Sequence, residues 1–168
     1  MSITLRYEAK FQVDEIPALA LDLVATNPTI QHRFTYPGIT GTRDASSTVV
    51  VDDVYSDTRA LAAGTYSLDL RALTSTLGVS KDFNGKKVKG ICIIANAANT
   101  AGIVVQDHTV NGYLIFATAT GEVTVYPGCP MLQIFDGNLA AIDATHKVIL
   151  FTSADVDAEF QISIAVGP

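Results

Sequence analysis

The sequence contains no tryptophan, two cysteines and three histidines in 168 residues. Cys92 and Cys129 form no CxxC pair, so free thiols are the expectation, although a bridge between these two stays open. His32, His108 and His146 are far apart along the chain. A cupin-type metal site would need a close His-x-His pair and a glutamate. We therefore expect no metal and no cofactor.

Charge is also scarce, since only 17% of the residues are Asp, Glu, Lys or Arg. The net charge is −6, and the eleven basic residues are scattered except for Lys86, Lys87 and Lys89. Nucleic-acid binding needs a basic stripe, because counterion release from phosphates drives it. We therefore expect no nucleic-acid partner. We also expect no membrane partner, because the apolar segment 16–25 is shorter than the about 20 residues of a membrane span.

Signatures of nucleophilic and phosphate chemistry are missing. No Gly-x-Ser-x-Gly elbow and no Gly-x-x-x-x-Gly-Lys loop occurs. A pair of carboxylates for glycoside hydrolysis stays open, because such pairs meet only in the fold. Asp52, Asp53 and Asp57 form the densest acidic cluster, which lacks EF-hand spacing and is expected to be a solvated loop rather than a weak Ca²⁺ site. The sequence indicates no enzyme.

Residues that favour strands are abundant. The chain has 16 Val, 14 Ile and 18 Thr, more than a quarter of its length. Residues 3–13 alternate strictly between apolar and polar side chains, which predicts a strand with one buried face. Five large apolar side chains on that strand are predicted to lie in an interface: Ile3, Leu5, Tyr7, Phe11 and Val13.

The rest of the chain alternates between apolar runs and turn signals, with a helical turn or two at 71–77. This pattern predicts an all-β, antiparallel β-sandwich, jelly-roll-like, with an N-terminal extended strand or arm. Besides 3–13, the predicted strands are 30–36, 48–55, 65–70, 87–95, 103–107, 113–117, 122–126, 131–135, 146–152 and 159–166.

The domain organisation follows from the break after the first strand. We predict an N-terminal strand or arm with its connection over 1–26 and a β-sandwich domain over 27–168. The first strand either closes the edge of its own sheet or adds to the sheet of a neighbouring subunit, and we favour the second. Cys92 lies in the apolar run 90–94 and is expected to be buried, with Cys129 more accessible.

Several segments resemble one group of proteins. They are Tyr55–Gly64, Tyr66–Thr74, Asp82–Ile91, Gly121–Gly128 and Asp143–Ile149. Over about residues 50–166 they are similar to small β-sandwich virion structural proteins of tailed bacteriophages. The resemblance implies a capsid decoration (cement) protein that stabilises the head. It also implies a homotrimer that contacts itself and a major capsid protein or another virion protein, is made in the host cytoplasm and resides in the virion.

A carbohydrate- or receptor-binding module of a phage appendage is the alternative. Such sites usually present exposed aromatic rings as stacking platforms, often tryptophan. This chain offers only tyrosines for that purpose, and most of them are expected to pack inward. The candidates are Tyr36, Tyr55, Tyr66, Tyr113 and Tyr126.

Overall fold

A computed structural model describes residues 4–7, 10–15, 30–35, 41–44, 50–76, 78, 80–116, 121–135 and 139–168, the first four ranges by their backbone alone. All regular elements in these residues are strands, and no helix is present among them. Every pairing between the strands is antiparallel. The predicted all-β, antiparallel fold class is confirmed.

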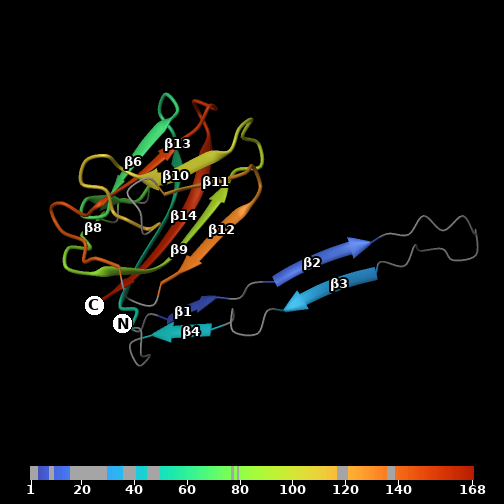
Figure 1. Cartoon of the computed structure of the whole chain (residues 1–168), viewed down its shortest axis with the longest axis horizontal. Helices are drawn as coiled ribbons and strands as arrows, with labels where there is room; N and C mark the ends of the chain where they lie inside the picture. Colours follow the sequence, from blue (N-terminus) through green and yellow to red (C-terminus); the bar gives the residue numbers. More distant parts are fainter. Residues whose placement is uncertain are drawn as a thin grey trace, which may run out of the picture.

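Eight strands form two four-stranded sheets that pack face to face (Figure 1). The β14 sheet has the order β12-β9-β14-β5, and the β13 sheet has the order β11-β10-β13-β6. The strands are β5 (Asp53–Ala60), β6 (Thr65–Asp69), β9 (Lys87–Ala95), β10 (Ile103–Asp107), β11 (Glu122–Val125), β12 (Pro130–Ile134), β13 (Val148–Thr152) and β14 (Glu159–Gly167).

The pairing within these eight strands is nested along the chain. The first strand, β5, pairs with the last, β14, and the second, β6, pairs with the second last, β13. The next pair inward is β9 with β12, and the innermost is β10 with β11. A long antiparallel ribbon folded over on itself gives this order. The first and last strands of the sandwich, β5 and β14, are therefore neighbours in one sheet.

Aromatic rings from both sheets meet in the core. Phe151 of β13 stacks on Phe160 of β14 with ring centroids 4.5 Å apart, and Tyr66 of β6 meets Phe160 edge-on at 6.0 Å. Along β14, Phe160, Ile162 and Ile164 are each at most 1% exposed, whereas the residues between them face outward. Burying each such side chain stabilises the fold by about 1.5–3 kcal/mol. This alternation holds the two sheets together.

Residues 113–116 close one end of the core, but they form no strand, so the strand predicted at 113–117 is wrong over its described part. The Tyr113 ring turns inward instead, and its hydroxyl accepts a bond from the Val88 N–H at 3.0 Å and donates to the Ala140 carbonyl at 2.9 Å. Burial raises the pKa of Tyr113 to about 12. These two bonds satisfy the buried phenol and link the loop to β9 and to residue 140.

Asp107, at the end of β10, is 8% exposed, and its Oδ2 atom has no hydrogen-bond partner. Burial raises its pKa, although the bond from the Ile115 N–H at 3.2 Å works in the opposite direction. Asp107 therefore binds its proton more tightly in the folded chain than in the unfolded chain, and its contribution to stability declines as the pH rises through the raised pKa.

We expect Asp107→Asn to gain stability relative to the wild type as the pH rises from 3.8 through the raised pKa of Asp107, because the amide avoids burying a charge. Urea unfolding of both chains at three pH values in this range measures the difference. The free-energy difference between the two chains should grow across this window and level off above it. A difference that stays constant would contradict the assigned burial of a titrating carboxyl group.

Three other sequence expectations need correction. Residues 71–77 contain no helical turn in their described part, because β7 (Leu73–Thr74) pairs with β8 (Ser80–Lys81) and buries Leu73. Tertiary packing outweighs the helical spacing there. The strand predicted at 48–55 begins later, as β5. No strand is predicted between 36 and 48, yet this stretch contains β4 (Gly41–Asp44).

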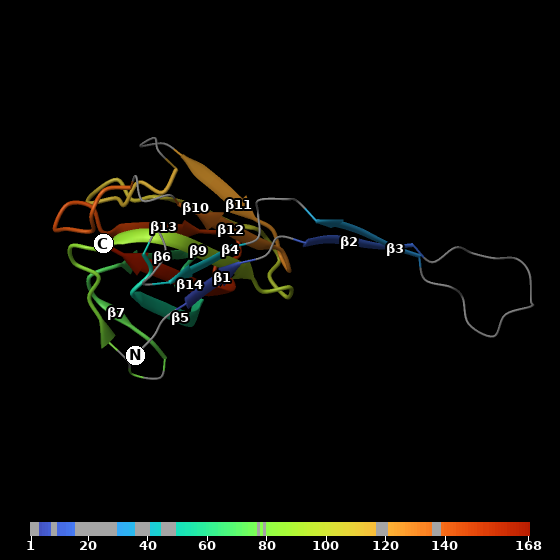
Figure 2. The same ribbon diagram turned by 90° about the horizontal axis from the view of Figure 1, so that it is seen from below.

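The N-terminal segment forms a two-stranded ribbon, which we call the ribbon. It consists of β1 (Thr4–Tyr7) paired with β4, and β2 (Lys10–Glu15) paired with β3 (Ile30–Thr35). Within the described residues these four strands pair only with one another. Figures 1 and 2 both show β2 and β3 side by side, reaching well beyond the sandwich.

The predicted interface residues fall on this ribbon. Ile3 lies outside the described residues, whereas Leu5 and Tyr7 are in β1 and Phe11 and Val13 are in β2. Their role in an interface stays a prediction, as does exchange of the strand between subunits.

The register of the ribbon brings two phenylalanines together. Phe11 lies opposite Phe34, and Val13 lies opposite His32, so these four positions share one face. Because β3 and β4 pair with β2 and β1, Ile30–Thr35 and Gly41–Asp44 belong with the N-terminal strands. The domain boundary at residue 26 stays a prediction.

Candidate interaction surface

The outer face of the β14 sheet is the most distinctive surface among the described side chains. Strand alternation and register place three rows of four residues there, and a further row with Glu159 and Ala60 follows at one end. None of the residues in the three rows is charged, and we call them the neutral face. They are Val54, Ser56, Thr58, Gly90, Cys92, Ile94, Pro130, Leu132, Ile134, Gln161, Ser163 and Ala165.

Apolar atoms on the neutral face are open to solvent. Val54 and Ile94 are each 39% exposed and Leu132 is 42% exposed. Beside them the small residues Gly90 and Ala165 leave a shallow groove of about 60 Å³. A sheet face with no charge and with exposed aliphatic side chains is typical of a contact surface for another protein.

The outer face of the β13 sheet provides a contrast. The register places Glu122 of β11 and Asp69 of β6 on it, and Asp69 accepts a bond from the Lys147 ammonium at 2.6 Å. Threonine occupies three of its other positions. The rows of this face thus contain two carboxylates, whereas the outer face of the β14 sheet has one, Glu159, beyond the neutral face.

The acidic residues of β5 do not face this surface. Asp57 is held at the inner edge of the sheet, where its carboxylate accepts bonds from the Thr76 N–H at 3.1 Å and the Thr76 hydroxyl at 2.7 Å and pairs with Arg59 at 2.7 Å. Burial by itself would raise the pKa of Asp57, but the bonds from Thr76 hold it below its ordinary value. The hydrogen bonds of this carboxylate therefore hold the loop at Thr76 against β5.

The other two acids of the predicted cluster also have cationic partners. Asp53 lies 2.5 Å from the Lys81 ammonium, and Asp52 lies 2.9 Å from that of Lys86. The expectation of a solvated loop is therefore wrong for Asp53 and Asp57, which are strand residues held in ion pairs. Sequence spacing could not reveal these partners, because Lys81 and Lys86 lie in a segment that reaches β5 only in the fold.

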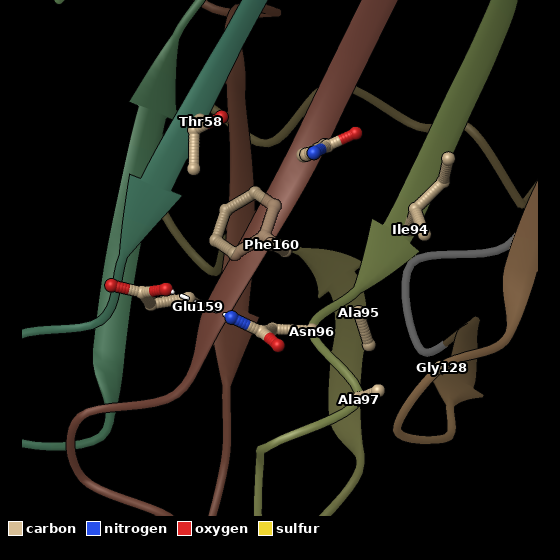
Figure 3. Close-up of a pocket in the computed structure, with 9 residues that line it drawn as sticks. Thr58, Ile94, Ala95, Asn96, Ala97, Gly128, Glu159 and Phe160 are labelled. Atoms are coloured by element: carbon tan, nitrogen blue, oxygen red, sulfur yellow. Dashed lines mark hydrogen bonds between the residues drawn. The ribbon is translucent and has the colours of Figure 1, made fainter.

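A hollow of about 360 Å³ lies at one end of the neutral face (Figure 3). Its floor is formed by Phe160, and its polar rim includes Gln161 as well as Asn96 and Glu159. The Asn96 amide donates a bond to the Glu159 carboxylate at 2.9 Å, which is the dashed line in Figure 3. This pair and the hollow mark the boundary where the neutral face ends.

The two cysteines differ in exposure as predicted, but Cys92 is not fully buried. Cys92 is half-buried in the middle row of the neutral face, and Cys129 is exposed. Burial raises the pKa of the Cys92 thiol. The apolar run around it suggested a core position, yet Cys92 occupies an outward position of β9, where the neighbouring side chains cover it only in part. Both thiols are free.

The tyrosines divide in the way that the sequence suggested. Tyr55 and Tyr113 are buried, at 3% and 1% exposure, and Tyr66 packs partly against the core. Tyr126 is 66% exposed, and Tyr36 lies outside the described residues. Exposed aromatic surface on the sandwich is thus small.

The described part of the chain offers neither a metal site nor a membrane-spanning helix. In it, no three His, Cys, Asp or Glu side chains come together in a way that could hold a metal ion. No helix there has the length and hydropathy to cross a membrane.

Comparison with known proteins gives no relative. No protein-family model matches the sequence, and a search of curated proteins finds no match. The surfaces described above and the resemblance in the sequence are therefore the basis for assigning a function.

Proposed function

We propose that this chain is a structural protein of a bacteriophage particle, a capsid decoration (cement) protein that stabilises the head through contacts between proteins. The eight sandwich strands would then form a jelly roll, which their nested pairing supports. The resemblance over residues 50–166 supports the same assignment. The role is not enzymatic and needs no cofactor.

The ribbon is the observation that carries this proposal. Its strands pair with one another and extend beyond the sandwich (Figure 2). A two-stranded ribbon is only marginally stable by itself in water, so it needs a surface to pack on. A neighbouring subunit or a capsid protein provides such a surface in an assembled particle. The shared face of Phe11, Phe34 and Val13 supplies apolar residues for that contact.

The neutral face is a second feature that supports this function. An acidic chain that associates with further protein needs a surface where carboxylates do not meet, and the neutral face is such a surface. On the sandwich, the carboxylates of Asp53 and Asp57 are engaged by cations, which suits a structural role. In the particle, the proposed partners are further copies of the chain, expected as a trimer, and the major capsid protein or another virion protein.

Purified particles test the proposal. Particles from the source of this sequence, isolated by density gradient, should contain the chain in many copies as measured by quantitative mass spectrometry. Particles that lack the chain should release their genome at a lower temperature than complete particles, which dye-accessibility melting measures. A chain found only in the soluble fraction, or particles equally stable without it, would exclude a decoration role.

The hollow beside Asn96 favours one alternative, a carbohydrate-binding module of a phage appendage. Its amide and carboxylate groups are those that bind sugar hydroxyls. Binding on a glycan array that is lost in Asn96→Ala and kept in Asn84→Ala, an exposed asparagine elsewhere, would favour this function over decoration. Its weakness is that the only aromatic side chain lining the hollow, Phe160, is 1% exposed and offers no stacking platform.

A further inference from the structure

We propose that the neutral face binds the neutral face of a second copy of this chain, with the two sheets stacked about a two-fold axis. This contact extends the proposed function, because it names one surface through which copies associate. Every residue in it belongs to the sandwich, and none belongs to the ribbon.

The distribution of charge favours a second copy of the chain as the partner of this face. Two copies carry −6 each and repel each other over most orientations. The neutral face presents twelve uncharged residues, so two copies can approach through it without placing a carboxylate against a carboxylate. Glu159, the next outward residue on β14, lies at the end of this face and stays accessible to water. A basic partner would find no complementary charge here.

The shape of the neutral face allows a ridge of one copy to fit a groove of the other. Leu132 and Ile134 on β12 form a ridge, and Gly90, Ser163 and Ala165 on β9 and β14 form a trough beside it. A rotation of 180° about an axis along the strands lays the β12 ridge of one copy over the β14 trough of the other. Such stacked sheets pack about 10 Å apart, as the two sheets of a sandwich do.

The size of the face indicates a weak contact. Four strands spaced by about 4.8 Å, each with three outward residues, cover about 300–400 Å² in projection. A standard stable interface buries about 800 Å² on each partner. We therefore expect the isolated pair to dissociate at micromolar concentration. In an assembly held by further contacts, multivalency makes such a weak contact effective.

Ser163→Asp in the full-length chain is the decisive variant. The Ser163 hydroxyl bonds to the Ser56 hydroxyl at 2.8 Å in the middle of the face, so the variant places one carboxylate per copy in the contact. The matched control is Ser67→Asp, at an exposed outward position of β6 in the other sheet. Sedimentation at 1–100 micromolar should show reversible doubling of mass for the wild type and the control. We expect Ser163→Asp to weaken this association at least tenfold.

A thiol readout tests the geometry in the same samples. In a Cys129→Ser background Cys92 is the only thiol, and it lies in the row of Ser163. Its rate of labelling should fall as the concentration of the wild-type chain rises, and should be independent of concentration in Ser163→Asp. If Ser163→Asp fails to fold, Leu132→Asp on the edge strand β12 replaces it.

Three results would overturn the inference. They are wild-type mass that does not double over this range, Ser163→Asp that doubles as the wild type does, and Cys92 labelling that does not respond to doubling. None of them bears on the presence of the chain in particles, which the gradient experiment measures separately. Conversely, a chain absent from particles can still pair through this face.

Discussion

Removal of residues 2–49 is expected to leave a folded sandwich that no longer attaches to its particle. All eight sandwich strands begin at or after Asp53, and the ribbon strands pair only with one another in the described residues. The truncated chain should therefore unfold cooperatively in urea, while its binding to particles that lack the chain falls at least a hundredfold. Circular dichroism and co-sedimentation with such particles measure the two effects.

Deletion of residues 2–13 alone is the informative comparison. It removes β1 and most of β2 but leaves β3 and β4 with unpaired edges, which favour aggregation. We expect this shorter deletion to be less soluble than the deletion of 2–49. If the chain without 2–49 fails to fold, the ribbon contributes to the core of its own sandwich. If that chain binds particles normally, the ribbon has no role in attachment.

Asp57→Ala is expected to lower the free energy of unfolding by about 2–3 kcal/mol at pH 7, because Thr76 loses its acceptor and Arg59 loses its ion-pair partner. The Asp57 side chain is 3% exposed, so water replaces those contacts poorly. Urea unfolding at pH 7 measures the loss. Asp157→Ala, at an exposed position, is the control and should change stability by less than about 0.5 kcal/mol.

The pH dependence of this difference has a definite sign. The pKa of Asp57 is lower in the folded chain than its ordinary value of 3.8. Its contribution is therefore fully present above pH 3.8 and is lost as the pH falls through the lowered pKa. The wild type should approach the stability of Asp57→Ala in strong acid. A difference that persists unchanged to low pH would show that the carboxylate acts through packing alone.

Much of the sandwich could be predicted from local sequence. The strands at 87–95 and 103–107 have the predicted bounds, and β14 extends the predicted 159–166 by one residue. These segments are bounded by turn residues and either alternate or are continuously apolar, so burial and local preference agree there. The fold class followed from the same agreement.

Local pattern failed where a distant contact decides the conformation. The leucines of 71–77 have helical spacing, yet the chain there is fastened to β5 by Asp57, and Leu73 enters the core. Tyr113 lies in an apolar run, yet residues 113–116 form no strand, and the Tyr113 hydroxyl accepts a bond from the N–H of Val88. Neither partner is close in sequence.

The sequence by itself determined the all-β class, the scarcity of charge and the alternation of the first strand. Only the tertiary structure decided which uncharged residues form one surface. The neutral face takes three residues from each of four separate segments, at 54–58, 90–94, 130–134 and 161–165. A shift of one residue in the register of any strand would turn its three residues to the core. The register depends on pairing between strands far apart in the chain, and so does the face that we propose for self-association.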